Sequence, residues 1–191
     1  MSENFAKKSI SFYIEFVYPF SKIPRAGWSK YWGVTEDKAE SVATHVFEVA
    51  LFAQFVAREL DLDINLQKVL ELALVHELEE LIIGDIPARD EKIDKKALKS
   101  KARAELEDKL SNLKSKDYFL SLLDELEAQS SPEARFIREI DKLIFSLHGA
   151  GYCKDGIGNT CDGGKLTEYS LPAIKTEELR QIAERIKEKI K

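Results

Sequence analysis

The sequence predicts an all-α fold for a chain of 191 residues. In several long segments, apolar side chains recur every three or four residues, which is typical of helices with one buried face. No segment shows the sustained apolar–polar alternation of a strand, and no internal repeat is apparent. The length suits one domain with a sizeable core, so we expect a single bundle of about six to seven helices.

Three helices are predicted in the first half of the chain, over residues 4–18, 40–60 and 65–83. Pro19 cannot continue the first helix, and Ser41 can accept a hydrogen bond from a free N–H at the start of the second. Asn65 and Gly84 are typical of an N-cap and a C-terminal stop for the third. Residues 21–38 contain proline and glycine and are predicted to be a loop.

Four more helices are predicted over residues 91–113, 118–129, 131–147 and 176–190. Ser131 followed by Pro132 is typical of a helix start, and the acidic residues after Thr176 suit the positive end of a helix dipole. Residues 148–175 hold six of the nine glycines and both cysteines, so we expect a long loop there. The predicted single domain therefore spans residues 1–191, with a core over 4–147, the loop over 148–175 and the last helix over 176–190.

Composition and charge narrow the class of protein. The net charge of −5 at pH 7 argues against a nucleic acid polymer as a partner. No apolar run reaches the roughly 20 residues of a membrane span. The first residues also lack the basic-then-apolar order of a signal peptide. We therefore expect a cytoplasmic protein without membrane contact. Cys153 and Cys161 are too few for a disulfide framework, which leaves a free thiol pair or a single disulfide.

Acidic and histidine side chains stand inside the apolar pattern of the third predicted helix. His76 and Glu80 are four residues apart and would share one helix face, with Glu77 about 100° around the axis from His76. Ionised carboxylates beside a buried face are costly unless they are paired or hold a cation. His45 and Asp141 lie on two other apolar helices. Two imidazoles and two carboxylates form a mixed set that suits Mn, Fe, Co, Ni or Zn better than calcium.

Each of these signals also has a plainer interpretation. A lone histidine on a helix is more often a core or surface residue than a metal ligand. Arg25 could pair with an acid of the first helix, while Trp28 and Trp32 could anchor their loop in the core. Asp85 could be a turn residue that binds its own backbone. His148 is predicted to end its helix, where its charge suits the C-terminal dipole, and we do not place it among the metal ligands.

Five short motifs are similar in order and spacing to those of the HD-domain phosphohydrolases, and in particular to the 5′-deoxyribonucleotidase-like branch; they cover residues 24–28, 40–45, 76–80, 84–87 and 141–142. The resemblance extends over roughly residues 4–147 and implies a helical HD-domain bundle. One position departs from the pattern. The family takes its name from a His-Asp pair, whereas His76 is followed by Glu77. Because both acids ligate such metals, we expect Glu77 to remain a ligand.

The resemblance also implies roles for individual residues. One divalent metal ion (Mn, Co, Ni, Zn, Fe or Mg) would be held by His45, His76, Glu77 and Asp141. Glu80 and Asp85 would be the catalytic residues that orient the attacking water or take its proton. Arg25 would bind the substrate phosphate, and Trp28 would pack near the sugar or base.

The implied function is the release of phosphate from a (deoxy)ribonucleoside 5′-monophosphate. Hydrolysis of nucleoside triphosphates or cyclic nucleotides is the alternative enzymatic reading. A non-catalytic helical metal-binding or interaction module is the third, if Glu77 marks a lost activity. Proteins of this branch commonly form homo-oligomers, so the resemblance also implies an oligomer, with a dimer favoured.

Overall fold

The computed structural model describes residues 2–87, 90, 93–168 and 170–190. Within these ranges the regular structure is helical, apart from one isolated bridge between Pro24 and Ser41. Seven of the described helices have ten residues or more, in agreement with the predicted number. The predicted all-α fold is therefore confirmed.

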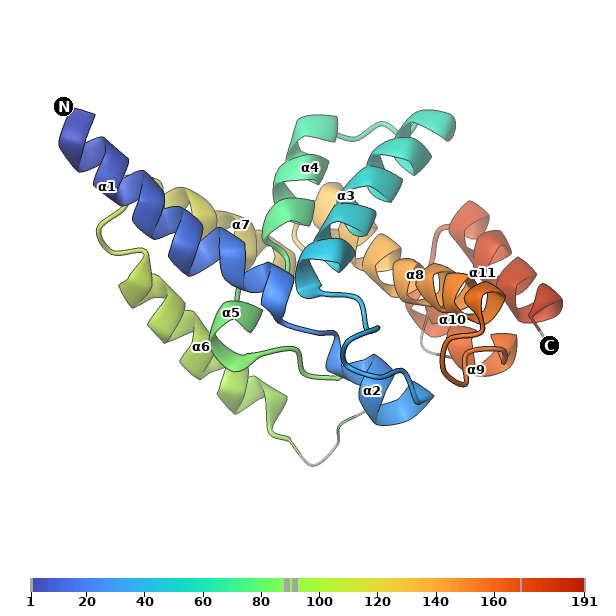
Figure 1. Cartoon of the computed structure of the whole chain (residues 1–191). Coiled ribbons are helices and arrows are strands. Elements are labelled where there is room, and N and C mark those ends of the chain that lie inside the picture. The colour runs from blue at the N-terminus through green and yellow to red at the C-terminus, as the bar shows by residue number, and fades with distance from the viewer. Residues whose placement is uncertain (1, 88–89, 91–92, 169, 191) are drawn as a thin grey trace.

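Three helices form the centre of the molecule: α3 (Val42–Glu59), α4 (Leu66–Val75) and α8 (Pro132–Asp155). They pack against one another, and Figure 1 shows α1, α6 and α7 on one side of them and α9, α10 and α11 on the other. Leu72 of α4 and Ile140 of α8 are fully buried between them. Burying such a side chain contributes about 1.5–3 kcal/mol, so this contact holds the elements that carry the site.

The surrounding helices are α1 (Ser2–Phe12), α2 (Ala26–Trp32), α5 (Glu80–Ile83), α6 (Lys95–Lys109), α7 (Lys116–Ala128), α9 (Gly163–Thr167), α10 (Ser170–Ala173) and α11 (Glu177–Lys189). A π-helical turn and a 3-10 helix (Tyr13–Val17 and Tyr18–Lys22) continue α1 past the predicted stop at Pro19. Residues 91–92, where one helix was predicted to start, lie outside the described residues. None of the described helices is both long and apolar enough to cross a membrane.

Side-chain caps fix the starts of the central helices, as predicted. Ser41 Oγ accepts a hydrogen bond from the N–H of Thr44 at 3.2 Å. Asn65 Oδ1 accepts bonds from the first turn of α4, and Ser131 Oγ accepts one from Ala134 at 3.0 Å. Such a cap contributes about 0.5–2 kcal/mol.

The predicted helix over residues 65–83 is wrong in its second half. α4 ends at Val75, and α5 begins only at Glu80. Between them, hydrogen bonds from Leu78 N to Val75 O and from Glu80 N to Glu77 O, both 2.9 Å, make a tighter turn. Leu78 is buried all the same, so the apolar pattern continued across the break. Residues 76 and 80 therefore do not share one helix face.

The predicted loop over residues 21–38 contains a helix. Trp28 and Trp32 are one turn apart on α2 and are both buried in a cluster with Val34 and Tyr152. This burial stabilises a short helix that proline and glycine had argued against. Gly33 ends it, at a φ of +65°.

The predicted loop over residues 148–175 is also largely wrong, because α8 continues to Asp155 and ends at Gly156 with a φ of +68°. Gly149 lies inside this helix, where a Cβ atom would come within 2.2 Å of Leu166 Cδ2. The missing side chain of Gly149 allows Leu166 to pack closely against α8, and the residue does not end the helix. His148 therefore lies within α8 and not at its end.

The two cysteines form a disulfide. Cys153 of α8 is bonded to Cys161, with a Cα–Cα distance of 4.8 Å. It links the last turns of α8 to the segment that leads into α9. Of the two alternatives left by the sequence, the structure has the disulfide.

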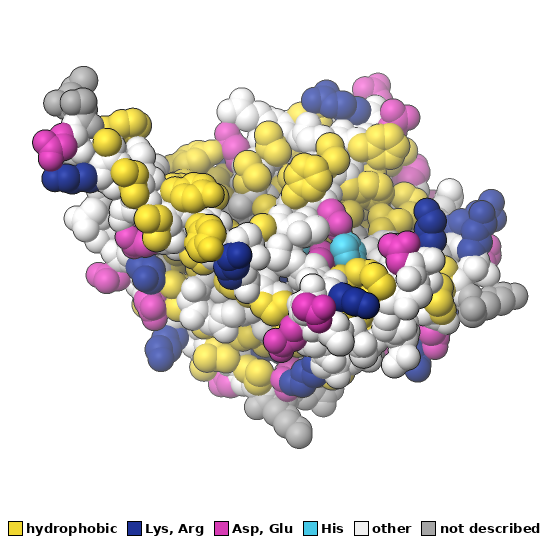
Figure 2. Space-filling view, viewed as in Figure 1, with side chains coloured by type: hydrophobic (Ala, Val, Ile, Leu, Met, Phe, Trp, Pro, Cys, Tyr) yellow, Lys and Arg dark blue, Asp and Glu magenta, His cyan; other side chains and the backbone are white. Residues whose placement is uncertain are grey.

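Hydrophobic side chains also gather on the surface. Figure 2 shows them over α1 and over α3 and α4. The large exposed apolar residues of α1, of the π-helical turn that follows it, and of α3 and α4 include Phe5, Ile10, Ile14, Phe47, Leu51, Phe55, Leu70 and Leu74.

Candidate metal centre

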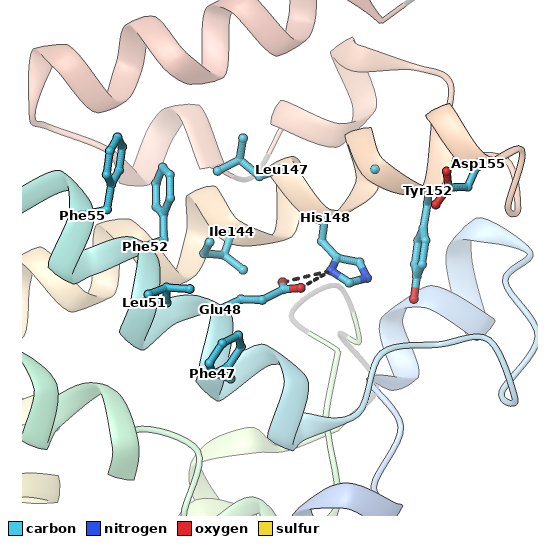
Figure 3. A pocket seen from close by; sticks show the side chains of 11 residues that line it. Phe47, Glu48, Leu51, Phe52, Phe55, Ile144, Leu147, His148, Tyr152 and Asp155 are labelled. Atoms are coloured by element: carbon cyan, nitrogen blue, oxygen red, sulfur yellow. Dashed lines mark hydrogen bonds and ion pairs between the residues drawn. The ribbon is translucent and has the colours of Figure 1, made fainter.

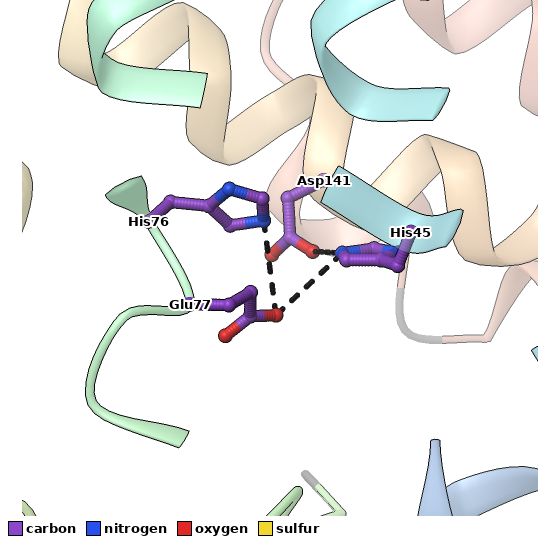
Figure 4. A group of neighbouring side chains, drawn as sticks. All are labelled: His45, His76, Glu77 and Asp141. Atoms are coloured by element: carbon purple, nitrogen blue, oxygen red, sulfur yellow. Dashed lines mark hydrogen bonds and ion pairs between the residues drawn. The ribbon is translucent and has the colours of Figure 1, made fainter. Parts of the chain in front are cut away.

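Four side chains from separate parts of the chain converge in the middle of the molecule. His45 lies on α3 and Asp141 on α8. His76 is the C-cap residue of α4, and Glu77 follows it in the turn. One nitrogen or carboxylate oxygen of each lies within 4.8 Å of the others. Figure 4 shows the side chains pointing toward a common centre, so the structure brings together the set named from the sequence.

The tautomer of His76 leaves one ring nitrogen free. Its Nδ1 lies 2.7 Å from the carbonyl oxygen of Ala73. Because a carbonyl can only accept, Nδ1 carries the proton, and Nε2 of the neutral ring has a lone pair. Nε2 is buried, has no hydrogen-bond partner among the described residues and lies 3.7 Å from Glu77 Oε1. A histidine held by a carbonyl in this way is typical of metal ligands.

The protonation states favour metal binding. Burial lowers the pKa of His76 more than the nearby Glu77 raises it, so the ring stays neutral. Burial acts to raise the pKa of Glu77, but Arg25 and the two neighbouring histidines together outweigh it and the pKa falls to about 2. Against the same burial effect, the charge of Lys142 helps hold the pKa of Asp141 well below its usual value. A neutral imidazole and ionised carboxylates are the forms that bind metals.

This set fits a divalent metal ion. His45 Nε2 lies 3.1 Å from Asp141 Oδ1 and 3.6 Å from Glu77 Oε1. Both carboxylates are largely shielded from water, which favours their use as ligands of an ion held between them and the histidines. The free Nε2 of His76 and the mixed nitrogen and oxygen donors match the preferences of Mn, Fe, Co, Ni and Zn.

Arg25 ties the acidic residues beside the metal centre together. Its Nη1 lies 2.7 Å from Glu77 Oε1, 2.8 Å from Asp85 Oδ1 and 3.5 Å from Glu80 Oε1. Burial disfavours the charged guanidinium, but these three carboxylates outweigh burial and raise the pKa of Arg25 further. The plainer interpretation, an ion pair with the first helix, is wrong. Arg25 instead pairs with acids of the site.

Glu80 and Asp85 have different surroundings. Asp85 Oδ2 accepts a hydrogen bond from the N–H of Ala26 at 2.7 Å, so Asp85 holds the first turn of α2 as well as Arg25. Burial and the charge of Glu77 raise the pKa of Glu80 well above its usual value. Glu80 Oε2 is buried without a hydrogen-bond partner among the described residues. A carboxyl with a raised pKa is suited to proton transfer near neutral pH.

The structure contradicts the predicted substrate contact of Trp28. The residue is 1% exposed, and its ring stacks on Phe145 with centroids 4.3 Å apart. Its Nε1 donates a hydrogen bond to Glu40 Oε1 at 2.7 Å. Trp28 therefore anchors α2 in the core, as Trp32 also does. The resemblance located the residue but not the direction of its side chain.

Comparisons with known proteins agree with this geometry. Residues 21–169 match the family model of the HD domain. The chain belongs to the HD-domain family. This HD-domain chain is 35% identical over 150 residues to 5′-deoxynucleotidase HDDC2 of Xenopus laevis, which covers 77% of this chain and 71% of that protein. It is 32% identical over 142 residues to the protein of the same name from Danio rerio, covering 73% and 68%.

A solved structure gives the same result for the fold. The crystal structure of a Pyrococcus horikoshii protein aligns with a TM-score of 0.69 and 30% identity. It covers 93% of this chain and 95% of that chain. Because 93% of the chain is covered, the shared fold extends beyond residues 4–147, on which the resemblance was based.

The Glu77 position distinguishes this HD-domain chain from the His-Asp pattern. Its Oε1 is close to His45 Nε2 and His76 Nε2, and also to Arg25 Nη1. Glu77 thus belongs to the metal centre and to the arginine cluster at once. Sequence reasoning missed this shared contact, because 52 residues separate Arg25 from Glu77 and no local pattern links them.

Proposed function

We propose that this chain is a metal-dependent phosphohydrolase that releases phosphate from nucleoside 5′-monophosphates, with deoxyribonucleotides preferred. The observation that carries the proposal is the convergence of the four ligand residues of the metal centre, with Arg25 and Glu80 beside them. The relatives named 5′-deoxynucleotidase support this substrate class.

The metal centre and the residues beside it would have separate roles in hydrolysis. A divalent ion, when bound, supplies a Lewis acid that polarises a phosphoryl oxygen and acidifies water. Glu80, with its raised pKa, takes a proton from the attacking water. Arg25 offsets the negative charge of the phosphoryl oxygens with charge-assisted hydrogen bonds. Asp85 orients Arg25 and the first turn of α2 through its two contacts, and we assign it a positioning role.

A metal and substrate panel tests the proposal. Protein stripped of metal and reloaded with Mn, Co, Ni, Zn, Fe or Mg is incubated with nucleoside mono- and triphosphates and cyclic nucleotides. We expect inorganic phosphate from 5′-monophosphates, with deoxyribonucleotides faster than ribonucleotides. Glu80→Gln should lose this activity while binding the metal, and Glu105→Gln, on the exposed surface of α6, is the matched control.

Other products contradict the proposal in defined ways. Pyrophosphate or triphosphate from nucleoside triphosphates, or a linear nucleotide from a cyclic one, would assign a different phosphoester substrate. Bound metal without any product would assign a non-catalytic module.

We further propose a cytoplasmic homodimer. The negative net charge argues against nucleic acids and anionic membrane surfaces as partners. The apolar side chains exposed on α3 and α4 support self-association. Light scattering coupled to size-exclusion chromatography measures the mass, and a mass of one chain at all concentrations would contradict the dimer.

A further inference from the structure

A second group of metal-ligating side chains lies outside the metal centre. Glu40 stands in the loop before α3, Glu48 lies on α3 and His148 lies on α8. One ligand atom of each lies within 4.8 Å of the others. Figure 3 shows Glu48 and His148 pointing toward each other between the two helices.

Glu40 has an unsatisfied buried oxygen. The residue is 6% exposed, and its Oε1 accepts the hydrogen bond from Trp28 Nε1. Its Oε2 is buried and has no hydrogen-bond partner among the described residues. The backbone is fixed, because the N–H of Glu40 donates to the Tyr152 hydroxyl at 2.7 Å. Since the side chain is buried and Trp28 holds Oε1, Oε2 stays away from bulk water, and a cation on the Oε2 side would compensate its charge.

His148 presents one nitrogen to both acids. Its Nδ1 lies 2.9 and 3.0 Å from the two oxygens of Glu48 and 3.7 Å from Glu40 Oε2. The ring meets Tyr152 edge-on, with centroids 4.4 Å apart, which limits its rotation. One imidazole nitrogen and two carboxylate groups therefore face the same point.

An ion can reach this point from solvent. Glu48 and His148 line a cavity of about 790 Å³ between α3 and α8, whose other walls include Phe52, Leu147 and Tyr152. Glu40 is buried and is not among the residues that line this cavity. The cluster thus has one fixed buried ligand and two ligands at an open side.

We propose that Glu40, Glu48 and His148 bind a divalent transition-metal ion in a second site that is separate from the HD metal centre. One nitrogen and carboxylate oxygens are a donor set for Zn, Co, Mn or Fe. Metal–ligand bonds of about 2.0–2.2 Å require the donors to draw closer together, and the partly exposed side chain of Glu48 is free to do so. The bound ion would link the loop before α3 to α8 and so stabilise the folded protein.

The competing explanation is an ion pair without metal, in which protonated His148 neutralises the two carboxylates. Burial lowers the pKa of His148, but the hydrogen bond with Glu48 and the charges of both acids outweigh it and raise the pKa. If the cluster is only an ion pair, it binds no metal ion. The two explanations therefore differ in the number of metal ions bound per chain.

Cobalt binding to the full chain tests the proposal. Metal-stripped protein is titrated with Co²⁺ by calorimetry and visible spectroscopy, in the wild type and in Asp141→Asn, which impairs the HD metal centre. We expect two ions per chain in the wild type and one in Asp141→Asn. In both backgrounds, His148→Ala and Glu48→Gln should each lose one ion. Asp155→Asn is the matched control, because Asp155 lines the same cavity but does not belong to the cluster; it should lose none.

Two further readouts separate this site from the proposed function, since neither depends on phosphate release. In Asp141→Asn, Co²⁺ should raise the melting temperature, and adding His148→Ala should abolish the rise. An anomalous scattering peak beside His148 Nδ1 in Co²⁺-loaded crystals would support the site. A wild type that binds one ion, or a second ion that both cluster variants retain, would overturn it.

Discussion

Both clusters of this molecule draw ligands from α3 and α8, but His76 of the first and His148 of the second present their ring nitrogens in opposite ways. In the HD metal centre, His76 donates Nδ1–H to a carbonyl, and its neutral Nε2 is left without a partner. In the second cluster, Nδ1 of His148 already contacts Glu48. The first site is therefore prepared for a metal ion. In the second, the raised pKa of His148 favours the protonated ring, and a metal ion would have to displace that proton.

The difference follows from the surroundings of the two rings. Burial lowers the pKa of His76 more than Glu77 and Asp141 raise it, and Glu77 is also paired with Arg25. No arginine or lysine contact offsets Glu40 and Glu48 among the described interactions, so His148 supplies the positive charge. Because no arginine among the described residues pairs with Glu40 or Glu48, these two carboxylates raise the pKa of the histidine that they face.

The largest effect is expected when the first cluster loses a ligand. Asp141→Asn should lower phosphate release by at least about 10²-fold, the scale of removing one preorganised electrostatic group. Inorganic phosphate assays at saturating metal measure this. Activity within a factor of a few of the wild type would show that Asp141 does not hold the reactive ion. The cluster variant Glu48→Gln is the control and should keep its activity.

The second effect concerns the charge balance at Arg25. Arg25→Met leaves Glu77, Glu80 and Asp85 without their cation, so the metal-free protein should lose roughly 3–5 kcal/mol of stability. A bound metal ion replaces part of this charge, so the loss should be smaller in metal-loaded protein. Urea unfolding with and without metal measures both values. Equal losses of stability in metal-free and metal-loaded protein would contradict the assignment of Glu77 to both the metal centre and the arginine cluster.

The third effect is the restoration of the family pattern. Glu77→Asp should keep metal binding but shorten the reach of the carboxylate toward Arg25, whose Nη1 now lies 2.7 Å away. We expect a change in metal preference and an activity change within about tenfold, since either acid can ligate the ion. Metal-dependent rates of the two proteins should be compared. Complete loss of bound metal would show that the longer side chain is required.

The smallest effect is a pH dependence of the second cluster. The raised pKa of His148 in the folded state means that its contribution to stability is present below the unfolded pKa of about 6.5. It is lost as the pH rises through the higher folded value. In chelator-treated protein, His148→Gln should lower the melting temperature at pH 6 and have less effect at pH 9. An equal effect at both pH values would contradict the ion pair with Glu48.

The periodicity of apolar residues was sufficient to predict helices whose buried face continues without a break over several turns. α3 and the first part of α8 were predicted with their caps Ser41 and Ser131, since each cap precedes an apolar helical pattern. The same signal failed at the turn after His76, because Leu78 still reaches the core there. It failed again at Gly149, where glycine serves close packing against Leu166.

The sequence by itself determined the helical class and the residues that meet in the HD metal centre, because residue spacing and ordered motifs are properties of the chain. Only the tertiary structure decided which partners those residues have. It paired Arg25 with Glu77, buried Trp28 against Phe145 and brought Glu40 to His148. These contacts join residues far apart in the chain, and their distances depend on how the helices pack.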